Sequence, residues 1–118
     1  MSEVQIKRIY KAADKADGVR LLVDRLWPRG VKKEAAHIDE WMKAVAPSDE
    51  LRKSFHQGNL AWDEFEAKYV FELKNNTAVK DLLDIIHKNP KVTLLYAARD
   101  EHQNHALILQ QFITKTSH

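Results

Sequence analysis

Apolar and polar positions repeat along the chain with two different periods, which predict both strands and helices. Residues 4–10 alternate well enough for a first strand, whereas 19–27 and 92–98 are apolar on both faces. A strand that is apolar on both faces belongs inside a sheet that helices cover. The pattern therefore predicts a short sheet of about three strands within an α/β fold.

Apolar residues spaced three and four positions apart predict the helices. The first is expected over 35–46, where Ile38, Trp41, Met42 and Val45 share one face and Pro47 ends the helix. The others are expected at 49–55 after a Ser48 cap, at 60–74, between a Thr77 cap and Asn89-Pro90, and at 101–115. Four to five helices thus pack on the predicted sheet.

The connections between these elements predict how the strands lie. Strands 19–27 and 92–98 are separated by a helical excursion long enough for a crossover, so they are expected to be parallel neighbours whose carboxyl ends share one edge. The connection 11–18 is short for a crossover and long for a tight hairpin, which leaves the direction of the first strand open. The 118 residues fit one small, mainly parallel α/β domain over 1–118.

Composition narrows the chemistry. The chain has no cysteine, which excludes disulfides, thiolate metal sites and a cysteine nucleophile. No apolar stretch approaches the roughly 20 residues that span a membrane, so a cytoplasmic protein without a membrane partner is expected. The glycine-rich phosphate loop, the dinucleotide fingerprint and the Gly-x-Ser-x-Gly elbow are all missing. The sequence predicts no particular cofactor and no oligomeric state.

Charge is distributed unevenly along the chain. Residues 1–33 hold nine Lys or Arg against four Asp or Glu, a net charge of +5, whereas the whole chain carries +2. A basic first third favours an anionic ligand such as a phosphate, a carboxylate or a nucleic acid backbone. The alternative is a solvated basic surface.

The segment at the end of the second strand, Asp24-Arg25-Leu26-Trp27-Pro28-Arg29-Gly30, marks the candidate site, because open α/β folds bind ligands at the carboxyl ends of their strands. Arg25, Arg29 and, after the third strand, Arg99 are predicted to converge on one anion, with Arg52 as a weaker fourth candidate. Alternatively, Arg25 and Arg29 brace the fold by pairing with Asp24 or with acids of the helices. Trp27 either stacks on a planar ligand or covers the core.

Three residues near these strand ends are candidates for proton transfer: Asp24, Tyr96 and His105. Asp100 and Gln103 form a variant capping box, which predicts a helix start that favours an anion. Asn104 is a candidate ligand-binding residue, although it or His105 could instead only tie the loop down. A metal site built on His102 and His105 with nearby aspartates is a weaker alternative, and no metal is predicted.

Several segments together resemble one family. They are residues 18–30, Ala46-Pro47-Ser48 with Leu51-Arg52, the 62–73 helix, and 93–98 with Asn104-His105-Ala106. These segments resemble the YeaO-like proteins, a bacterial and archaeal family of domains of unknown function, over nearly the whole chain. The resemblance implies a small α/β domain and assigns no reaction, substrate or catalytic residue.

Two hypotheses from different classes follow. In the first, the protein is an enzyme or a small-ligand sensor whose cleft binds a phosphate- or carboxylate-bearing molecule. In the second, it is a nucleic-acid or protein-binding accessory module that uses the basic first third as its contact surface. The rigid, chemically capable residues at two strand ends favour the first hypothesis.

Overall fold

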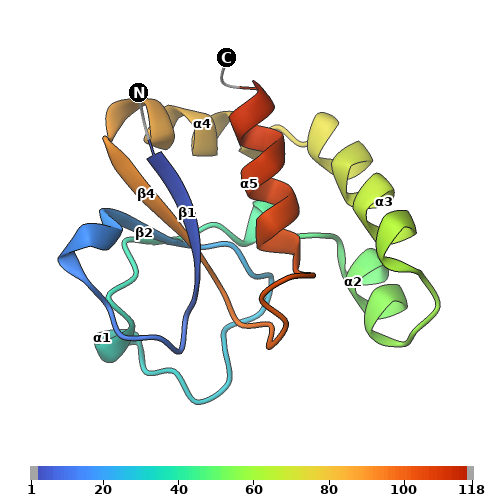
Figure 1. Cartoon of the computed structure of the whole chain (residues 1–118), viewed down its shortest axis with the longest axis horizontal. Helices are drawn as coiled ribbons and strands as arrows, with labels where there is room; N and C mark the ends of the chain where they lie inside the picture. Colours follow the sequence, from blue (N-terminus) through green and yellow to red (C-terminus); the bar gives the residue numbers. More distant parts are fainter. Residues whose placement is uncertain (1–2, 117–118) are drawn as a thin grey trace.

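The computed structural model describes residues 3–116 and contains a sheet of four parallel strands (Figure 1). The strands are β1 (Glu3–Arg8), β2 (Val19–Leu22), β3 (Glu40–Trp41) and β4 (Lys91–Tyr96), in the spatial order β1-β4-β2-β3. The predicted small α/β fold is confirmed, and so is the parallel pairing of β2 with β4. The first strand, whose direction the sequence left open, is parallel to β4.

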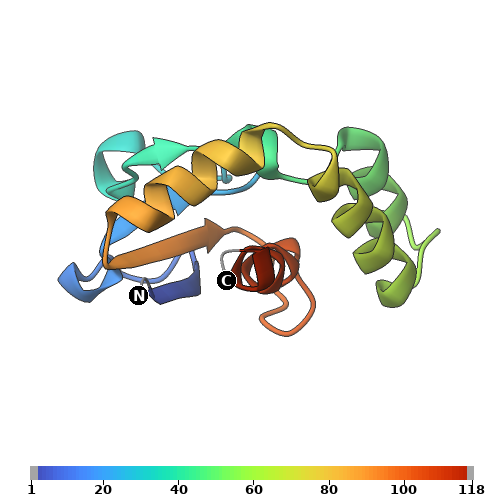
Figure 2. The same cartoon turned by 90° about the horizontal axis from the view of Figure 1, so that it is seen from above.

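Helices cover the two faces of the sheet unequally. The α-helices are α1 (Lys33–Ala36), α2 (Asp49–His56), α3 (Trp62–Lys74), α4 (Ala78–Lys88) and α5 (His105–Thr116), and two 3-10 turns are η1 (Lys15–Asp17) and η2 (Lys43–Val45). Residues of α4 and α5 share the main core on one face, whereas Ala36 of α1 packs in a smaller core on the other. Figure 2 shows η1 and α1 at the left of the view and α5 to the right of the strands. α3 packs against α5, and α2 packs against α3, so this pair extends beyond the sheet (Figure 1).

The main core lies on the side of the long helices. It unites alternate strand residues, among them Leu21, Val92 and Leu94, with buried residues of α3, α4 and α5. A second, smaller core lies on the opposite face at the carboxyl ends of the strands, where Leu22 and Leu95 pack with Ala36. The alternation of side chains in a strand sends neighbouring residues such as Leu21 and Leu22 into different cores.

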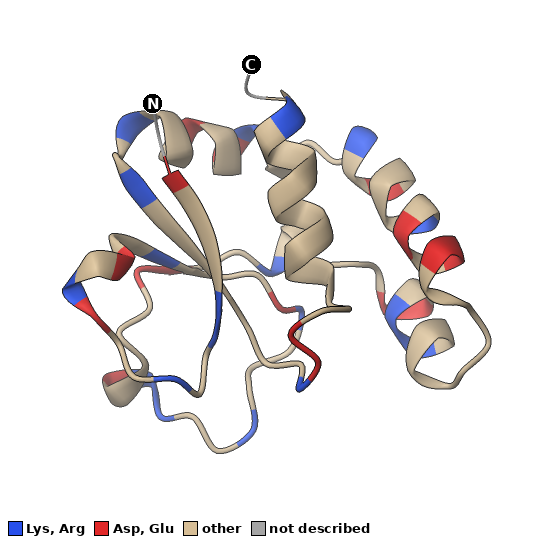
Figure 3. Cartoon of the chain, in the orientation of Figure 1, with Lys and Arg blue, Asp and Glu red and all other residues tan. Residues whose placement is uncertain are grey.

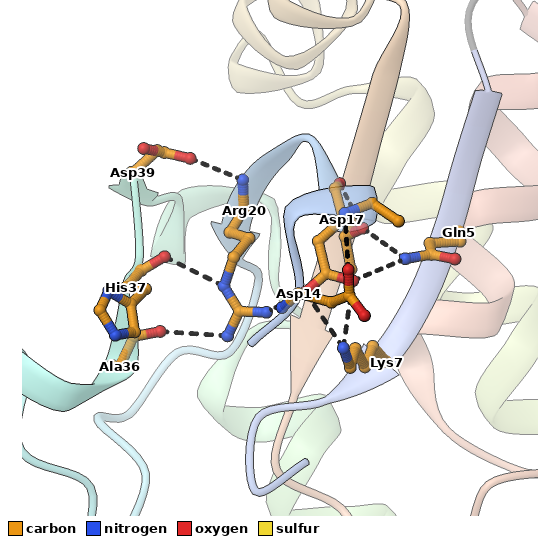
Figure 4. A network of polar contacts seen from close by, with 10 residues as sticks. Gln5, Lys7, Asp14, Asp17, Arg20, Ala36, His37 and Asp39 are labelled. Carbon is orange, nitrogen blue, oxygen red and sulfur yellow. Dashed lines mark hydrogen bonds and ion pairs between the residues drawn. The ribbon is translucent and has the colours of Figure 1, made fainter. Parts of the chain in front are cut away.

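A buried polar network fills the same face at the amino ends of the strands (Figure 4). Its centre is Asp17, whose carboxylate accepts hydrogen bonds from Gln5, Lys7 and Arg20. The Arg20 guanidinium also donates to the carbonyls of Ala36 and His37, at 3.0 Å each. Burial by itself would raise the pKa of Asp17, but the hydrogen bonds from Lys7, the Asp14 backbone and Arg20 outweigh it and lower that pKa.

Gly18 allows η1 to lie close to the start of β4. Its φ of +64° is a left-handed conformation that other residues rarely adopt, and an added Cβ would lie 2.2 Å from the Lys91 carbonyl oxygen. Because Asp17 directly precedes this glycine, the close approach sets where the buried carboxylate sits.

The predicted helix over 35–46 is wrong. The helix ends after Ala36, because His37 adopts a left-handed φ of +50°. The backbone N–H of Asp39 and that of Met42 then donate to carbonyls of β2, both at 2.8 Å, which forms β3. The apolar spacing reflects burial in two cores: Trp41 packs in the small core and Met42 in the main core. Sheet pairing thus overrides a helical period.

Other element ends also differ from the predictions. β2 ends at Leu22 rather than at residue 27, and α5 begins at His105 rather than at residue 101. Thr77 precedes α4 at the N-cap position, as predicted, but its side chain makes no capping bond, and the Asn76 side chain accepts the Ala78 amide instead. The Ser48 cap is confirmed by its bond from the Leu51 amide, at 3.2 Å. No helix within residues 3–116 is long and apolar enough to cross a membrane.

Candidate functional site

A cavity of about 430 Å³ opens at the carboxyl ends of β2 and β4. Its walls come from the segment that follows β2, from the segment that joins β4 to α5, and from α2. Much of the lining is apolar or aromatic, with Trp27, Pro47, Phe55 and Phe65 among the residues that form it. The volume falls within the range of small-molecule sites, and its position is where parallel α/β folds bind ligands.

Asp24 joins the two strand ends that frame the cavity. Its Oδ2 accepts the Ala97 amide at 3.0 Å, and its carbonyl accepts the Trp41 indole N–H at 2.7 Å. Oδ1, however, is buried and has no hydrogen-bond partner among the residues the structure describes. A carboxylate placed in this way costs free energy unless a neighbouring positive charge or donor offsets it.

His105, the first residue of α5, lies against this carboxylate. Its Nε2 is 2.9 Å from the Val23 carbonyl oxygen and 3.0 Å from Asp24 Oδ1. The edge of the ring meets Tyr69 of α3, with 6.2 Å between ring centroids. Asp24 and His105 both line the cavity, so the proximity that the sequence predicted for them is present in the structure.

Arg25 lines the cavity but binds backbone. Its Nε donates to the Pro47 carbonyl at 2.8 Å, and its Nη2 donates to the Ala46 carbonyl at 3.2 Å. These bonds hold the segment that leads into α2 against the end of β2. Arg25 therefore braces the fold, as one alternative expected, through carbonyls instead of through acids.

Arg52 is the arginine whose position most suggests a ligand. It lies on α2, lines the cavity, and makes one exposed contact from Nη2 to Asp49 Oδ1 at 3.3 Å. Its Nε is buried without a hydrogen-bond partner within residues 3–116. The sequence offered only a weak signal for this residue, namely its place on the same helical face as Phe55 and His56, which also line the cavity.

The remaining predicted ligand residues have structural bonds of their own. The Trp27 indole donates to the Val31 carbonyl at 2.7 Å, and its ring packs edge-on against Trp41. Asn104 is buried, and its Oδ1 accepts the Leu107 amide at 2.9 Å, which caps α5. Arg29 is exposed, and its carbonyl accepts the Tyr10 hydroxyl at 2.9 Å. All three line the cavity.

Two predicted site residues are not part of the lining. Tyr96 is buried in the main core, where burial above all raises the pKa of its phenol, and Arg99 is exposed. The Asp100 carboxylate accepts the amides of His102 and Gln103, which lower its pKa. Within residues 3–116, no group of three or more histidine or acidic side chains is arranged to hold a metal ion.

Basic residues lie in the loops beyond the carboxyl ends of the strands, and one of them, Arg29, lines the cavity. Figure 3 shows Lys and Arg along the loops at the lower edge of the view, beyond the carboxyl ends of the strands. Exposed members of this group are Lys11, Arg29, Lys32 and Lys33. Lys11 pairs with Glu101 at 3.0 Å, and this contact lowers the pKa of that carboxyl.

Comparison with known proteins identifies the family. A family model described as the inactive DUF488-N3 subclade, DUF488-N3i, matches residues 3–118. The chain belongs to this family. It is 47% identical over 111 residues to the uncharacterized protein YeaO of Escherichia coli K12, with 93% of this chain and 96% of that protein covered. The resemblance to YeaO-like proteins is thereby confirmed.

Two mycobacterial proteins match the chain over nearly the same extent. The uncharacterized proteins Rv3073c of Mycobacterium tuberculosis H37Rv and Mb3100c of Mycobacterium bovis are each 37% identical over 112 residues, which cover 95% of this chain and 94% of each relative. No solved structure matches the chain. Membership of the family therefore indicates no ligand, and the geometry of the site is the basis for its interpretation.

Proposed function

We propose that the cavity binds a small organic anion and does not transform it. The observation that carries this proposal is Arg52, whose Nε is buried without a partner in the part of the chain that the structure describes. A buried donor without an acceptor costs free energy, and the fold tolerates that cost at this position. The side chain as a whole is 28% exposed, so an anion in the cavity can contact the outer N–H groups of the guanidinium. Carboxylates and phosphates are the groups that fit its planar fork.

The apolar wall indicates the rest of the ligand. Phe55 stacks on Phe65 with 4.4 Å between ring centroids, and Trp27 lies in the same lining. Such a surface gains free energy when it covers an apolar or aromatic body instead of water. The preferred ligand is therefore an anionic group attached to a ring or to another apolar moiety.

Basic residues near the cavity support the same proposal. Arg29 is exposed and lines the cavity, and the Nζ of Lys33 lies 5.8 Å from the ring centroid of Trp27, another lining residue. Like charges around a cleft raise the local concentration of oppositely charged ligands and speed their association. This effect requires no direct contact, so these residues need not converge on the anion.

Binding without turnover is supported by the positions of the acid and base candidates. Tyr96 is buried outside the lining, and Asp24 Oδ2 is already bonded to the Ala97 amide. The family model is described as that of an inactive subclade, which supports a binding role for this chain as well. A small-ligand sensor is the variant of the first hypothesis that these observations favour.

The test compares an anionic probe with its neutral counterpart. We expect benzoate to bind the full chain and benzamide to bind at least about tenfold more weakly, as measured by NMR titration. Arg52→Gln should weaken benzoate binding about 10- to 100-fold, which corresponds to the loss of a charge-assisted hydrogen bond. Arg99→Gln is the matched control, since Arg99 is exposed and does not line the cavity.

The same variants separate this proposal from the accessory-module hypothesis. A module that binds nucleic acid through its basic surface would bind a short single-stranded oligonucleotide with a steep dependence on salt. If wild type and Arg52→Gln bound that oligonucleotide equally and neither bound benzoate, the functional site would be the basic surface and not the cavity.

A further inference from the structure

The environment of His105 fixes which ring nitrogen carries the proton. Nε2 lies 2.9 Å from the Val23 carbonyl oxygen and 3.0 Å from Asp24 Oδ1, and both oxygens accept hydrogen bonds. A nitrogen placed between two acceptors must donate, so the neutral ring carries its proton on Nε2. This hydrogen points at Val23, which is why Asp24 Oδ1 lacks a hydrogen bond despite its distance.

The other ring nitrogen, Nδ1, is the atom available to a ligand. Nδ1 has no hydrogen-bond partner among residues 3–116, and it is not one of the buried polar atoms that lack a partner, so it reaches solvent. The ring lines the cavity, and its contact with Tyr69 restricts rotation. Turning the ring over would also break the bond to Val23. In the neutral ring Nδ1 thus presents a lone pair to the cavity.

We propose that Nδ1 of His105 shares a proton with the anionic group of the ligand and that this ligand is a phosphate monoester. The inference rests on the proposed anion-binding function and specifies its ligand. This lone pair accepts a hydrogen bond, which a fully ionised carboxylate or sulfate cannot donate. A phosphate monoester differs because its second proton dissociates near pH 6, so its monoanion still carries an O–H group. That O–H can donate to Nδ1 while the other phosphate oxygens keep their negative charge.

The charged groups around the ring are compatible with this arrangement. Asp24 Oδ1 lies 3.0 Å from Nε2, so its negative charge supports the proton on that nitrogen. Tyr69 contacts the ring from α3, and its phenol stays protonated, because burial above all raises its pKa well beyond the usual range. Arg25, Arg52 and His56 line the same cavity. The Arg25 guanidinium binds the Ala46 and Pro47 carbonyls, so Arg52 is the arginine that can contact the phosphate.

The experiment uses two esters of nearly the same shape. Phenyl phosphate holds an exchangeable proton near neutrality, whereas phenyl sulfate is a fixed monoanion without one. By calorimetry with the full chain at pH 6.5, we expect phenyl phosphate to bind at least about tenfold more tightly. Its binding should take up protons, seen as a binding enthalpy that changes with the ionisation heat of the buffer. At pH 8.5, where the ester is almost entirely in its dianionic form and has no O–H to donate, the preference should fall.

A variant isolates the nitrogen. His105→Gln removes the acceptor at Nδ1, so it should lose both the preference for phenyl phosphate over phenyl sulfate and the proton uptake. Arg99→Gln, at a residue that does not line the cavity, should keep both. Long-range proton–nitrogen NMR of wild type checks the starting state, which should show the Nε2–H form and a change at Nδ1 when phenyl phosphate is added. This measurement does not depend on the stability of the variant.

The outcomes distinguish the two proposals. Equal affinity for the two esters, or binding of phenyl phosphate without proton uptake, overturns the role of Nδ1 and leaves the anion-binding function standing. An absence of binding of both esters and of benzoate to the folded protein overturns the proposed function and with it the inference. An Nδ1–H form in the free protein contradicts the geometry on which the inference rests.

Discussion

The two ends of the sheet hold buried charges in opposite conditions. At the amino ends, Asp17 accepts hydrogen bonds from three side chains, and Arg20 donates to Asp17 and to two carbonyls (Figure 4). At the carboxyl ends, Asp24 Oδ1 and Arg52 Nε are buried without hydrogen bonds among the described residues. Buried aspartate and arginine side chains thus have hydrogen-bond partners at the amino ends of the strands, whereas at the carboxyl ends each has a buried atom without one.

This difference separates a structural site from a candidate functional one. A closed network ties segments together and leaves no group for a ligand, whereas unsatisfied buried groups in a cavity mark a place where the fold tolerates a cost. Residue type and burial alone do not distinguish the two ends. The hydrogen bonds of the buried groups do distinguish them, and substitutions at either end change these bonds.

The largest effect is expected from Arg20→Met. This change leaves Asp17 buried without its main partner and removes the donors to the Ala36 and His37 carbonyls. We expect the free energy of unfolding, measured by urea denaturation, to fall by about 3–5 kcal/mol. Lys7→Met is the control, because Lys7 lies at the rim with its side chain 18% exposed, and its loss should cost about 1 kcal/mol. Equal costs would contradict the central role of Arg20.

Gly18→Ala should disrupt the same end through the backbone. The new Cβ would meet the Lys91 carbonyl oxygen at 2.2 Å, and the positive φ adds strain, so we expect a loss of about 3 kcal/mol in urea denaturation. Gly58→Ala is a matched control, since its φ is also positive but no atom lies within 4 Å of the added Cβ. Its cost should be only about 1 kcal/mol. A similar loss in both variants would show that strain, and not the close approach, decides.

Acid should weaken the network in a defined range. The pKa of Asp17 is lowered in the folded protein relative to the usual 3.8, so its ionised form stabilises the fold above about pH 4 and this contribution is lost as the pH falls through the folded pKa. Asp17→Asn should therefore be less stable than wild type at pH 7, and the difference should shrink below pH 4. Urea midpoints measured from pH 2.5 to pH 7 test this expectation. A difference that stays constant with pH would assign the loss to the shape of the network.

The sequence located the site at the carboxyl ends of the strands, but it did not predict the hydrogen bonds there. The carboxyl ends of two parallel strands, at 24–29 and 96–100, were expected at one edge, and the bond between Asp24 and Ala97 confirms it. Which arginine would lack a partner could not be predicted, because the acceptors of Arg25 are the carbonyls of Ala46 and Pro47, and backbone carbonyls carry no signature in sequence.

The polar network around Asp17 at the amino ends of the strands was missed for a related reason. Gln5, Asp17 and Thr93 come from separate segments, and their meeting depends on β4 lying between β1 and β2. The strand β3 was missed because Trp41 and Met42 face different cores, a spacing that also fits one side of a helix. Local periodicity identified buried positions correctly and assigned the wrong backbone to them.

The smallest effect on stability should come from Arg52→Gln. Arg52 makes one exposed contact with Asp49 and has an unpaired Nε, so removing its charge deletes little that stabilises the fold and removes a buried group without a partner. We expect the free energy of unfolding to change by less than about 1 kcal/mol, in contrast to Arg20→Met at the other end. Urea denaturation of both variants side by side measures this contrast. If Arg52→Gln destabilised the protein as strongly as Arg20→Met, Arg52 would have a structural role, and the buried charges at both ends of the sheet would serve stability alone.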